Sequence, residues 1–220
     1  MRNLLFVAAA CVLAVLPARA EAPRTRVVCF GDSITKAGYP AVLAKELGDG
    51  VDVTNAGVNG NTTAQAMRRM ERDVLAHKPD VVVIFFGTND CRLAEPKVHV
   101  PVERYLENLQ KMIDAVTKGG GRVVLCTPPP IEEQAYFTRH ARAPFDAAGG
   151  LEKVLAEYCE TVRAVAERNK IPVVDLNRLL AKEEGWRSAD GVHPTEKGTG
   201  LIAKFVGEAV TRVMAEGKKE

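Results

Sequence analysis

The chain has 220 residues, which favours one domain with enough material for a substantial core. Its 30 lysines and arginines nearly balance its 28 aspartates and glutamates. A nucleic-acid partner requires a basic surplus that this chain lacks, so we expect no nucleic-acid binding.

The first 20 residues have the pattern of a secretory signal peptide. Arg2 supplies a positive start, residues 4–16 are apolar, and residues 18–20 form a small-x-small cleavage pattern. The apolar run is shorter than the roughly 20 residues that a membrane-spanning helix needs. We therefore predict cleavage near Ala20, export to the periplasm or the medium, and no stable membrane insertion afterwards. The mature chain, residues 21–220, is predicted to be a single domain.

Four cysteines remain after this cleavage: Cys29, Cys91, Cys126 and Cys159. Export permits disulfides, and four cysteines allow three full pairings. Because Cys29 and Cys126 fall in apolar runs that resemble buried strands, free thiols are favoured and the pairing stays open. The chain has no C-x-x-C, no H-E-x-x-H and no close histidine pair, so we expect no metal and no cofactor.

Short apolar runs alternate with longer helical patterns along the mature chain. In chain order, the predicted elements are strand Val27–Phe30, helix Pro40–Leu47, strand Val51–Asn55, helix Ala64–His77, strand Val81–Phe86, helix Val102–Thr117, strand Val123–Cys126, helix Leu151–Arg168, strand Pro172–Asp175 and helix Thr195–Met214. The third strand is apolar on both faces, as an interior parallel strand must be, whereas the second is more polar and suits an edge. This alternation predicts a three-layer α/β/α sandwich with a flavodoxin-like parallel sheet of about five strands.

One segment, Thr127–Gly150, fits no clear element. It begins with three prolines and then becomes polar and aromatic. A connection this long is often functional, so a lid or a substrate wall is expected here. Its candidate side chains are Tyr136, Phe137, His140 and Phe145.

Polar motifs follow the first three predicted strands directly. They are Gly31-Asp32-Ser33, the stretch Asn55–Asn61, and Gly87-Thr88-Asn89-Asp90. Asp190 and His193 lie in a loop just before the last helix. Ligands of an open parallel sheet bind beyond the carboxyl ends of its strands, so these segments are expected at one edge.

Three of these side chains have the chemistry of a nucleophile and its activating groups. Ser33 is the candidate nucleophile, and it needs a base to take its proton. His193 is the candidate base, and Asp190, three residues earlier, can hold the Nδ1–H of the imidazole so that Nε2 faces Ser33. Taken singly, each residue has an ordinary alternative: a capping serine, a solvated histidine and a turn aspartate.

Acyl transfer also requires hydrogen-bond donors for the developing oxyanion. Candidates are the backbone N–H of Ser33, the backbone N–H of Gly60 and the side-chain amide of Asn89. Gly60 suits this role because a residue without Cβ lets a ligand approach the backbone closely.

Together, these motifs resemble the SGNH, or GDSL-type, serine esterase and lipase superfamily. The matching blocks are Gly31–Thr35, Asn55–Gly60, Gly87–Asp90 and Asp190–Pro194, in order along nearly the whole mature chain. Ile34 stands where the motif's name has Leu, and Asn61 stands where many members have Asp. The resemblance implies a three-layer α/β fold that hydrolyses carboxylic esters without a metal. It assigns the triad to Ser33, Asp190 and His193, and the oxyanion site to Ser33, Gly60 and Asn89.

The expected function is therefore an exported serine esterase acting on a small-molecule, glycan or lipid ester. The low aromatic content and the lack of an obvious apolar lid favour small acyl groups, such as acetyl esters on carbohydrates. One alternative is a lysophospholipase or thioesterase acting on longer acyl chains. An alternative from another class is a non-catalytic flavodoxin-like protein that binds a ligand with the same loops.

Overall fold

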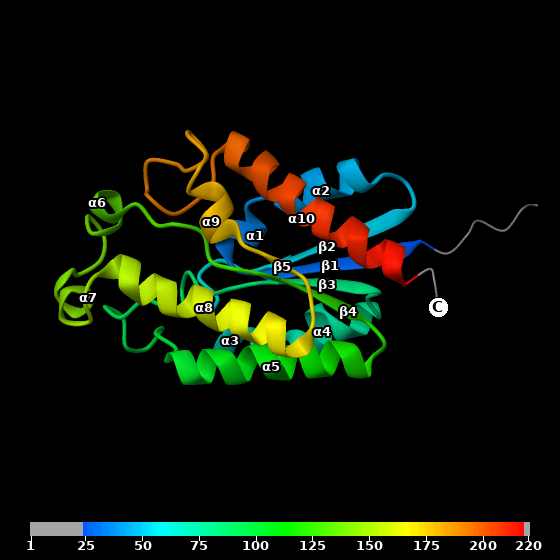
Figure 1. Ribbon diagram of the computed structural model, residues 1–220, viewed down its shortest axis with the longest axis horizontal. Helices are drawn as coiled ribbons and strands as arrows, with labels where there is room; N and C mark the ends of the chain where they lie inside the picture. Colours follow the sequence, from blue (N-terminus) through cyan, green and yellow to red (C-terminus); the bar gives the residue numbers. More distant parts are fainter. Residues whose placement is uncertain (1–23, 218–220) are drawn as a thin grey trace, which may run out of the picture.

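A five-stranded parallel sheet forms the centre of the protein (Figure 1). The computed structural model describes residues 24–217, so the predicted signal peptide lies outside the described residues. The strands are β1 (Thr25–Gly31), β2 (Val51–Gly57), β3 (Val81–Phe85), β4 (Arg122–Cys126) and β5 (Val173–Val174). Their order, β2-β1-β3-β4-β5, confirms the predicted flavodoxin-like sheet and the edge position of the second strand.

The first three strands end at the same level. Gly31, the last residue of β1, pairs with Gly57 at the end of β2 and with Phe85 at the end of β3. All five residues of β3 are buried, as expected for an apolar strand inside a parallel sheet. The segments that leave these three strands therefore start side by side.

Helices cover both faces of the sheet, which confirms the three-layer sandwich (Figure 1). One face packs against α1 (Ser33–Lys36), α2 (Tyr39–Leu47), α9 (Leu176–Leu180) and α10 (Glu196–Glu216). The other face packs against α3 (Thr63–Met67), α4 (Met70–Asp73), α5 (Val102–Lys118) and α8 (Leu151–Asn169). Alternate residues of each strand supply the two cores; for example, Val28 and Phe30 belong to the α5 side, and Val27 and Cys29 to the α10 side.

The single helix predicted for Ala64–His77 is wrong. The segment forms three short pieces: α3, α4 and the 3-10 helix η1 (Leu75–His77). The first break lies at Arg69, whose backbone leaves the helical range with φ −115° and ψ 0°. There the Arg69 side chain turns inward and donates to the backbone carbonyls of Gly31 and Ala56, contacts that a continuous surface helix does not require.

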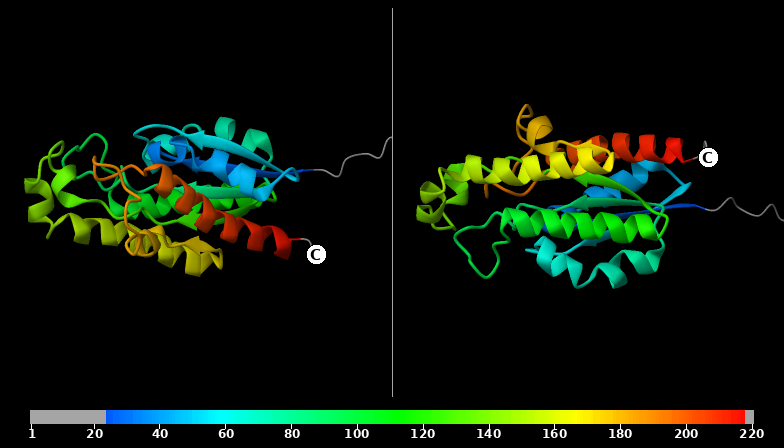
Figure 2. Two further views of the ribbon diagram at one scale, coloured as in Figure 1. Left: turned by 90° about the horizontal axis from the view of Figure 1, so that it is seen from above. Right: turned by 60° about the horizontal axis from the view of Figure 1, so that its bottom comes forward.

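The segment Thr127–Gly150, which was expected to lack regular structure, contains two short helices. They are α6 (Glu133–Tyr136) and α7 (Ala143–Ala147), and both lie beyond the carboxyl end of the sheet (Figures 1 and 2). Tyr136, Phe137 and Phe145 pack edge to face on one another, and His140 stacks on Tyr136 with ring centroids 4.3 Å apart. We call residues 131–150 the aromatic lobe.

Cys29, Cys91, Cys126 and Cys159 are buried free thiols. Burial raises the pKa of Cys29 to about 12, so this group behaves as a small apolar residue of the core. Within residues 24–217, no helix is both long enough and apolar enough to span a membrane.

Candidate active site

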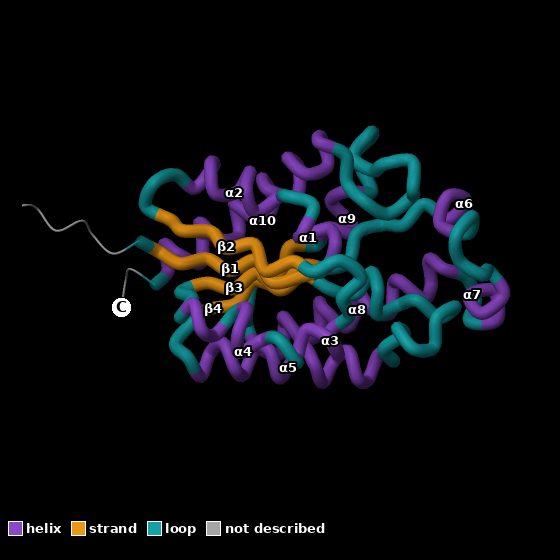
Figure 3. The backbone as a smooth tube through the Cα atoms, turned by 180° about the vertical axis from the view of Figure 1, so that it is seen from behind, coloured by secondary structure: helices purple, strands orange, loops and turns teal. Residues whose placement is uncertain are grey.

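Loops gather at the carboxyl end of the sheet, on the side of the aromatic lobe (Figure 3). Ser33 is the first residue of α1, directly after β1. The preceding Asp32 caps this helix, because its Oδ1 accepts from the N–H of Ile34 at 2.9 Å. A Cβ at Gly31 would come within 2.7 Å of the Phe85 carbonyl oxygen, so the turn into Ser33 requires a glycine there.

Ser33, His193 and Asp190 form one hydrogen-bonded line. The Oγ of Ser33 lies 2.8 Å from Nε2 of His193, although 160 residues separate them in sequence. The Nδ1 of His193 lies 2.5 Å from Oδ2 of Asp190. With the proton on Nδ1, the ring leaves Nε2 free to accept from the serine. The structure therefore brings the three predicted side chains together in the expected order.

The Asp190 carboxylate has a full set of donors. Its Oδ1 accepts from the hydroxyl of Ser188 at 2.7 Å and from the backbone N–H groups of Val192 and His193 at 2.9 Å each. Burial alone would raise the pKa of Asp190, but these bonds and the His193 ring hold it well below its ordinary value. Asp190 is therefore an anion throughout the physiological pH range.

The loop that carries Asp190 and His193 is held by its own backbone and by the aromatic lobe. The Ser188 N–H donates to the His193 carbonyl at 2.8 Å, which closes the loop across its base. Gly191 has φ +78°, and a Cβ there would lie 2.7 Å from the Glu132 carbonyl oxygen. The Gly191 carbonyl accepts from the Glu132 N–H at 2.8 Å. This close approach requires glycine at position 191.

Gly60 and Asn89 lie at the same end of the sheet. Gly60 has φ +70° and follows β2, with open space where a Cβ would point. The side-chain nitrogen of Asn89 lies 3.1 Å from both the Asp32 Oδ2 and the Asn61 carbonyl oxygen. An oxyanion that bound Asn89 would therefore have to share or replace one of these acceptors.

Two buried carboxyl groups support this end of the sheet. Burial, together with the nearby Asp90 carboxylate, raises the pKa of Asp32 to about 7, although the N–H of Ile34 and the Asn89 amide stabilise its charged form. Burial also raises the pKa of Asp90 to about 6, against the donors of Thr63. Asp90 Oδ1 accepts from the Thr63 N–H at 2.9 Å and from its hydroxyl at 2.5 Å, which ties the loop after β3 to α3.

Sequence reasoning missed several residues that frame the site. The Arg69 guanidinium donates to backbone carbonyls at the ends of β1 and β2, and the Ser188 hydroxyl donates to Oδ1 of Asp190. The aromatic lobe touches the loop of Asp190 and His193 at two places: the Glu132 N–H donates to the Gly191 carbonyl, and Arg139 donates to the Asp190 carbonyl. The sequence carries no signal for these contacts, because Arg69 has the pattern of a surface residue of an amphipathic helix and its partners are distant in sequence.

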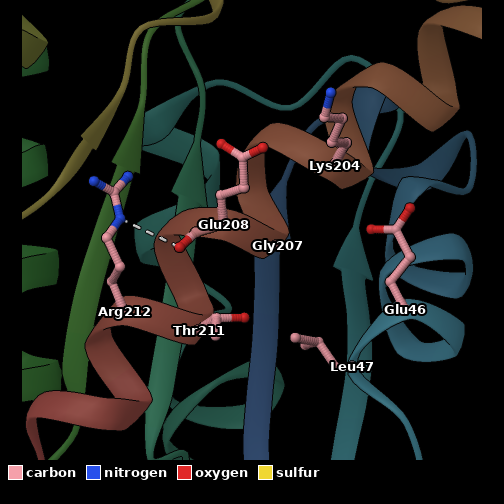
Figure 4. A pocket seen from close by; sticks show the side chains of 7 residues that line it. All are labelled: Glu46, Leu47, Lys204, Gly207, Glu208, Thr211 and Arg212. Carbon is pink, nitrogen blue, oxygen red and sulfur yellow. Dashed lines mark hydrogen bonds between the residues drawn. The ribbon is translucent and has the colours of Figure 1, made fainter.

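Within the described part of the chain, one cavity lies beside the site and another lies away from it. A cleft of about 390 Å³ runs along the outer side of the Asp190 loop, between this loop and the Glu132 turn. A second, of about 600 Å³, lies between α2 and α10 (Figure 4). Its lining residues are Glu46, Leu47, Lys204, Gly207, Glu208, Thr211 and Arg212, none of which belongs to the site. Among residues 24–217, no group of three or more His, Cys, Asp or Glu side chains is arranged to hold a metal ion.

Residues 29–201 match the profile of the GDSL-like lipase/acylhydrolase family. The chain belongs to this family. Its matched region spans all four predicted sequence blocks, from the strand before Ser33 to α10. The chain is therefore a carboxylic ester hydrolase, which sets aside the non-catalytic alternative.

Relatives of this GDSL-like hydrolase include proteins named for acetate esters. It is 34% identical over 194 residues to a bovine (Bos taurus) isoamyl acetate-hydrolyzing esterase 1 homolog, with 80% of this chain and 78% of that protein covered. It is 32% identical over 207 residues to the uncharacterized lipoprotein YqeF of Bacillus subtilis, with coverages of 80% and 85%. The crystal structure of the acetyl xylan esterase AlAXEase superposes with a TM-score of 0.72 at 29% identity, covering 84% of this chain and 99% of that one.

Proposed function

We propose that Ser33, His193 and Asp190 are the catalytic triad of this esterase. The observation that carries the proposal is the unbroken line of 2.8 Å and 2.5 Å contacts from Ser33 Oγ through the imidazole to Asp190. The Ser33 oxygen attacks the ester carbonyl as its proton moves to Nε2 of His193. The resulting imidazolium is stabilised by the Asp190 carboxylate, and it then protonates the departing alcohol. Water activated by the same ring releases the acid and restores the serine.

The oxyanion formed in both steps would be held by the Ser33 N–H, the Gly60 N–H and the Asn89 amide. Of the two acceptors that Asn89 already has, the Asp32 carboxyl group is the stronger when charged. The oxyanion therefore takes the place of the Asn61 carbonyl. Losing one such donor typically costs about 3 kcal/mol of transition-state stabilisation.

For the substrate, we propose small acyl groups, in particular acetyl esters on carbohydrates. Support comes from the relatives named for isoamyl acetate and acetyl xylan and from the chain's low aromatic content. Longer acyl chains, as in lysophospholipids or thioesters, are the competing outcome. A p-nitrophenyl ester series from acetate to palmitate, run beside acetylated xylan, separates the two. A maximum at acetate and release of acetate from the polysaccharide support the proposal, whereas a maximum at long chains contradicts it.

We also propose that the esterase is exported after cleavage near Ala20, because residues 1–20 have a signal-peptide pattern. The relative named as a lipoprotein agrees with a destination outside the cytoplasm. Mass spectrometry of the protein expressed from its full sequence in a bacterial host tests this proposal. The expected mature N-terminus is Glu21, and retention of the intact leader contradicts it.

Labelling with a fluorophosphonate tests the nucleophile directly, because the chain has only two serines, Ser33 and Ser188. This reagent forms a covalent bond only with an activated serine hydroxyl. We expect the label on the peptide that contains Ser33 and its loss in Ser33→Ala, which should also abolish hydrolysis of p-nitrophenyl acetate. A label on Ser188, or turnover by a folded Ser33→Ala, would remove Ser33 from the mechanism.

A further inference from the structure

A buried arginine bonds two of the segments that carry the proposed oxyanion donors, the one before Ser33 and the one around Gly60. Arg69, between α3 and α4, has a side chain only 9% exposed. Its Nη1 donates to the Ala56 carbonyl at 2.8 Å and its Nη2 to the Gly31 carbonyl at 2.9 Å. Its Nε donates to the side-chain oxygen of Asn61 at 2.7 Å. The guanidinium therefore bonds two segments at once: the end of β1, at Gly31, and β2 with the turn that follows it, at Ala56 and Asn61.

The partners of Arg69 lie next to the groups that would bind the oxyanion. Gly31 is two residues before Ser33, and Asn61 directly follows Gly60. The turn around Gly60 is itself tied to the same points, because Val58 N–H donates to the Gly31 carbonyl at 3.1 Å and Asn61 N–H to the Val58 carbonyl at 3.2 Å. One side chain thus links the strand end before Ser33 to the turn that carries Gly60.

The ion pair with Asp73 does not explain this arrangement. Asp73 Oδ2 lies 3.1 Å from Arg69 Nη1, but the same carboxylate also pairs with Arg72, which is exposed. A pair with Asp73 can form on the surface, whereas burying the guanidinium costs free energy unless its other N–H groups are satisfied. Here they are satisfied by sheet-end carbonyls and by Asn61, in a planar array that lysine cannot reproduce.

We propose that Arg69 is a positioning residue for the oxyanion site: it fixes the Ser33 strand end and the Gly60 turn relative to each other. The proposal rests on the proposed function, because it assumes that an oxyanion forms at Ser33. Arg69 itself touches no reacting atom. A small displacement of a donor can lower a rate by roughly 100-fold, so loss of this link should lower kcat more than it changes KM.

The test compares Arg69→Lys and Arg69→Met with Arg72→Ala as a matched control. Arg72 also pairs with Asp73 but has an exposed side chain and bonds no sheet-end carbonyl. For each variant, the melting temperature is measured first, and kcat, KM and the inhibition constant of a boronic acid are measured well below it. The boronic acid forms a tetrahedral adduct with the serine oxygen and reports on the oxyanion site. Arg69→Lys keeps a cation for Asp73, so it carries the test if Arg69→Met does not fold.

We expect the Arg69 variants to lose roughly 10- to 100-fold in kcat, with a parallel loss of boronic acid affinity and little change in KM. Arg72→Ala should match the wild type. Asn61→Ala removes the acceptor of Arg69 Nε, so combining it with Arg69→Lys should cost less than the product of the two single losses. Wild-type kcat and boronic acid affinity in a folded Arg69→Lys would overturn the proposal, as would fully multiplicative losses. If Ser33→Ala keeps full activity, the proposed function has failed instead.

Discussion

Asp190→Asn separates the geometry of the proposed triad from its proton chemistry. In the wild type, Oδ1 of Asp190 accepts from Ser188, Val192 and His193, whereas Oδ2 faces only His193 Nδ1. An asparagine at this position must keep its oxygen on the side of the three donors. Its NH₂ group is then forced to face Nδ1, which has to accept a hydrogen bond and give up its proton. The ring is held as the Nε2–H tautomer, which donates to Ser33 Oγ and cannot take the serine proton.

The expected loss of kcat in Asp190→Asn comes from the loss of the general base and not from a loss of structure. Because the substitution keeps the three donors to Oδ1, the fold and the 2.8 Å contact from Ser33 to His193 should persist. A triad held in the wrong tautomer loses roughly 10⁴-fold in kcat, which corresponds to about 5.5 kcal/mol of transition-state stabilisation. Initial rates with p-nitrophenyl acetate measure the loss of kcat, and thermal melting of the variant shows whether the fold persists.

Asp49→Asn is the matched control for this substitution. Asp49 is an exposed residue in the turn before β2, at the opposite end of the sheet, and the same chemical change there should leave kcat unaltered. Asp190→Asn activity within tenfold of the wild type, in a protein that melts normally, would show that Asp190 does not set the tautomer of His193.

Two further predictions concern the frame of the site. Gly191→Ala should destabilise the fold by roughly 2 kcal/mol or more and reduce activity, because φ is +78° and the new Cβ would lie 2.7 Å from the Glu132 carbonyl oxygen; urea unfolding with unchanged stability would refute this. Asp32 has a pKa raised to about 7 by burial, so the stability that it contributes at low pH is lost as the pH rises through 7. Relative to Asp32→Asn, the wild type should therefore lose unfolding free energy between about pH 4 and pH 8. Urea titrations across this range measure the difference, and a difference that stays constant with pH would contradict the prediction.

The sequence was sufficient for the sheet because its strands are short apolar runs between turn residues. The run from Val81 to Phe86 is apolar on both faces and became the buried centre of the sheet, whereas the more polar run from Val51 became its edge. The long helices were predicted within a few residues, since their apolar faces repeat with helical periodicity. The position of Ser33 followed from topology, because strand ends of a parallel sheet meet at one edge, whereas Asp190 and His193 follow no strand and their place beside Ser33 depends on the loop before α10.

What the sequence could not supply are contacts made by side chains across the fold. Arg69 reads as a surface residue of an amphipathic helix, and its role depends on carbonyls 13 and 38 residues away. The support of Asp190 by Ser188 depends on how one loop closes. The sequence motif also does not show that the side-chain nitrogen of Asn89 already has two acceptors, Asp32 and Asn61. An oxyanion bound by Asn89 has to share or replace one of them.

The aromatic lobe supports the site without supplying a proposed reacting group. Its Glu132 N–H holds the Gly191 carbonyl, and its Arg139 holds the Asp190 carbonyl, so the loop of the proposed base is fixed from outside the sheet. By contrast, Ser33 and Gly60 are fixed from within, by the ends of β1 and β2 and by Arg69. Because the two halves of the site have separate supports, changes in the lobe should shift the imidazole relative to the serine while the oxyanion donors stay in place. Substitutions in the aromatic lobe should therefore weaken proton transfer in both acylation and deacylation. They should affect boronic acid binding at the oxyanion site less than the Arg69 substitutions do.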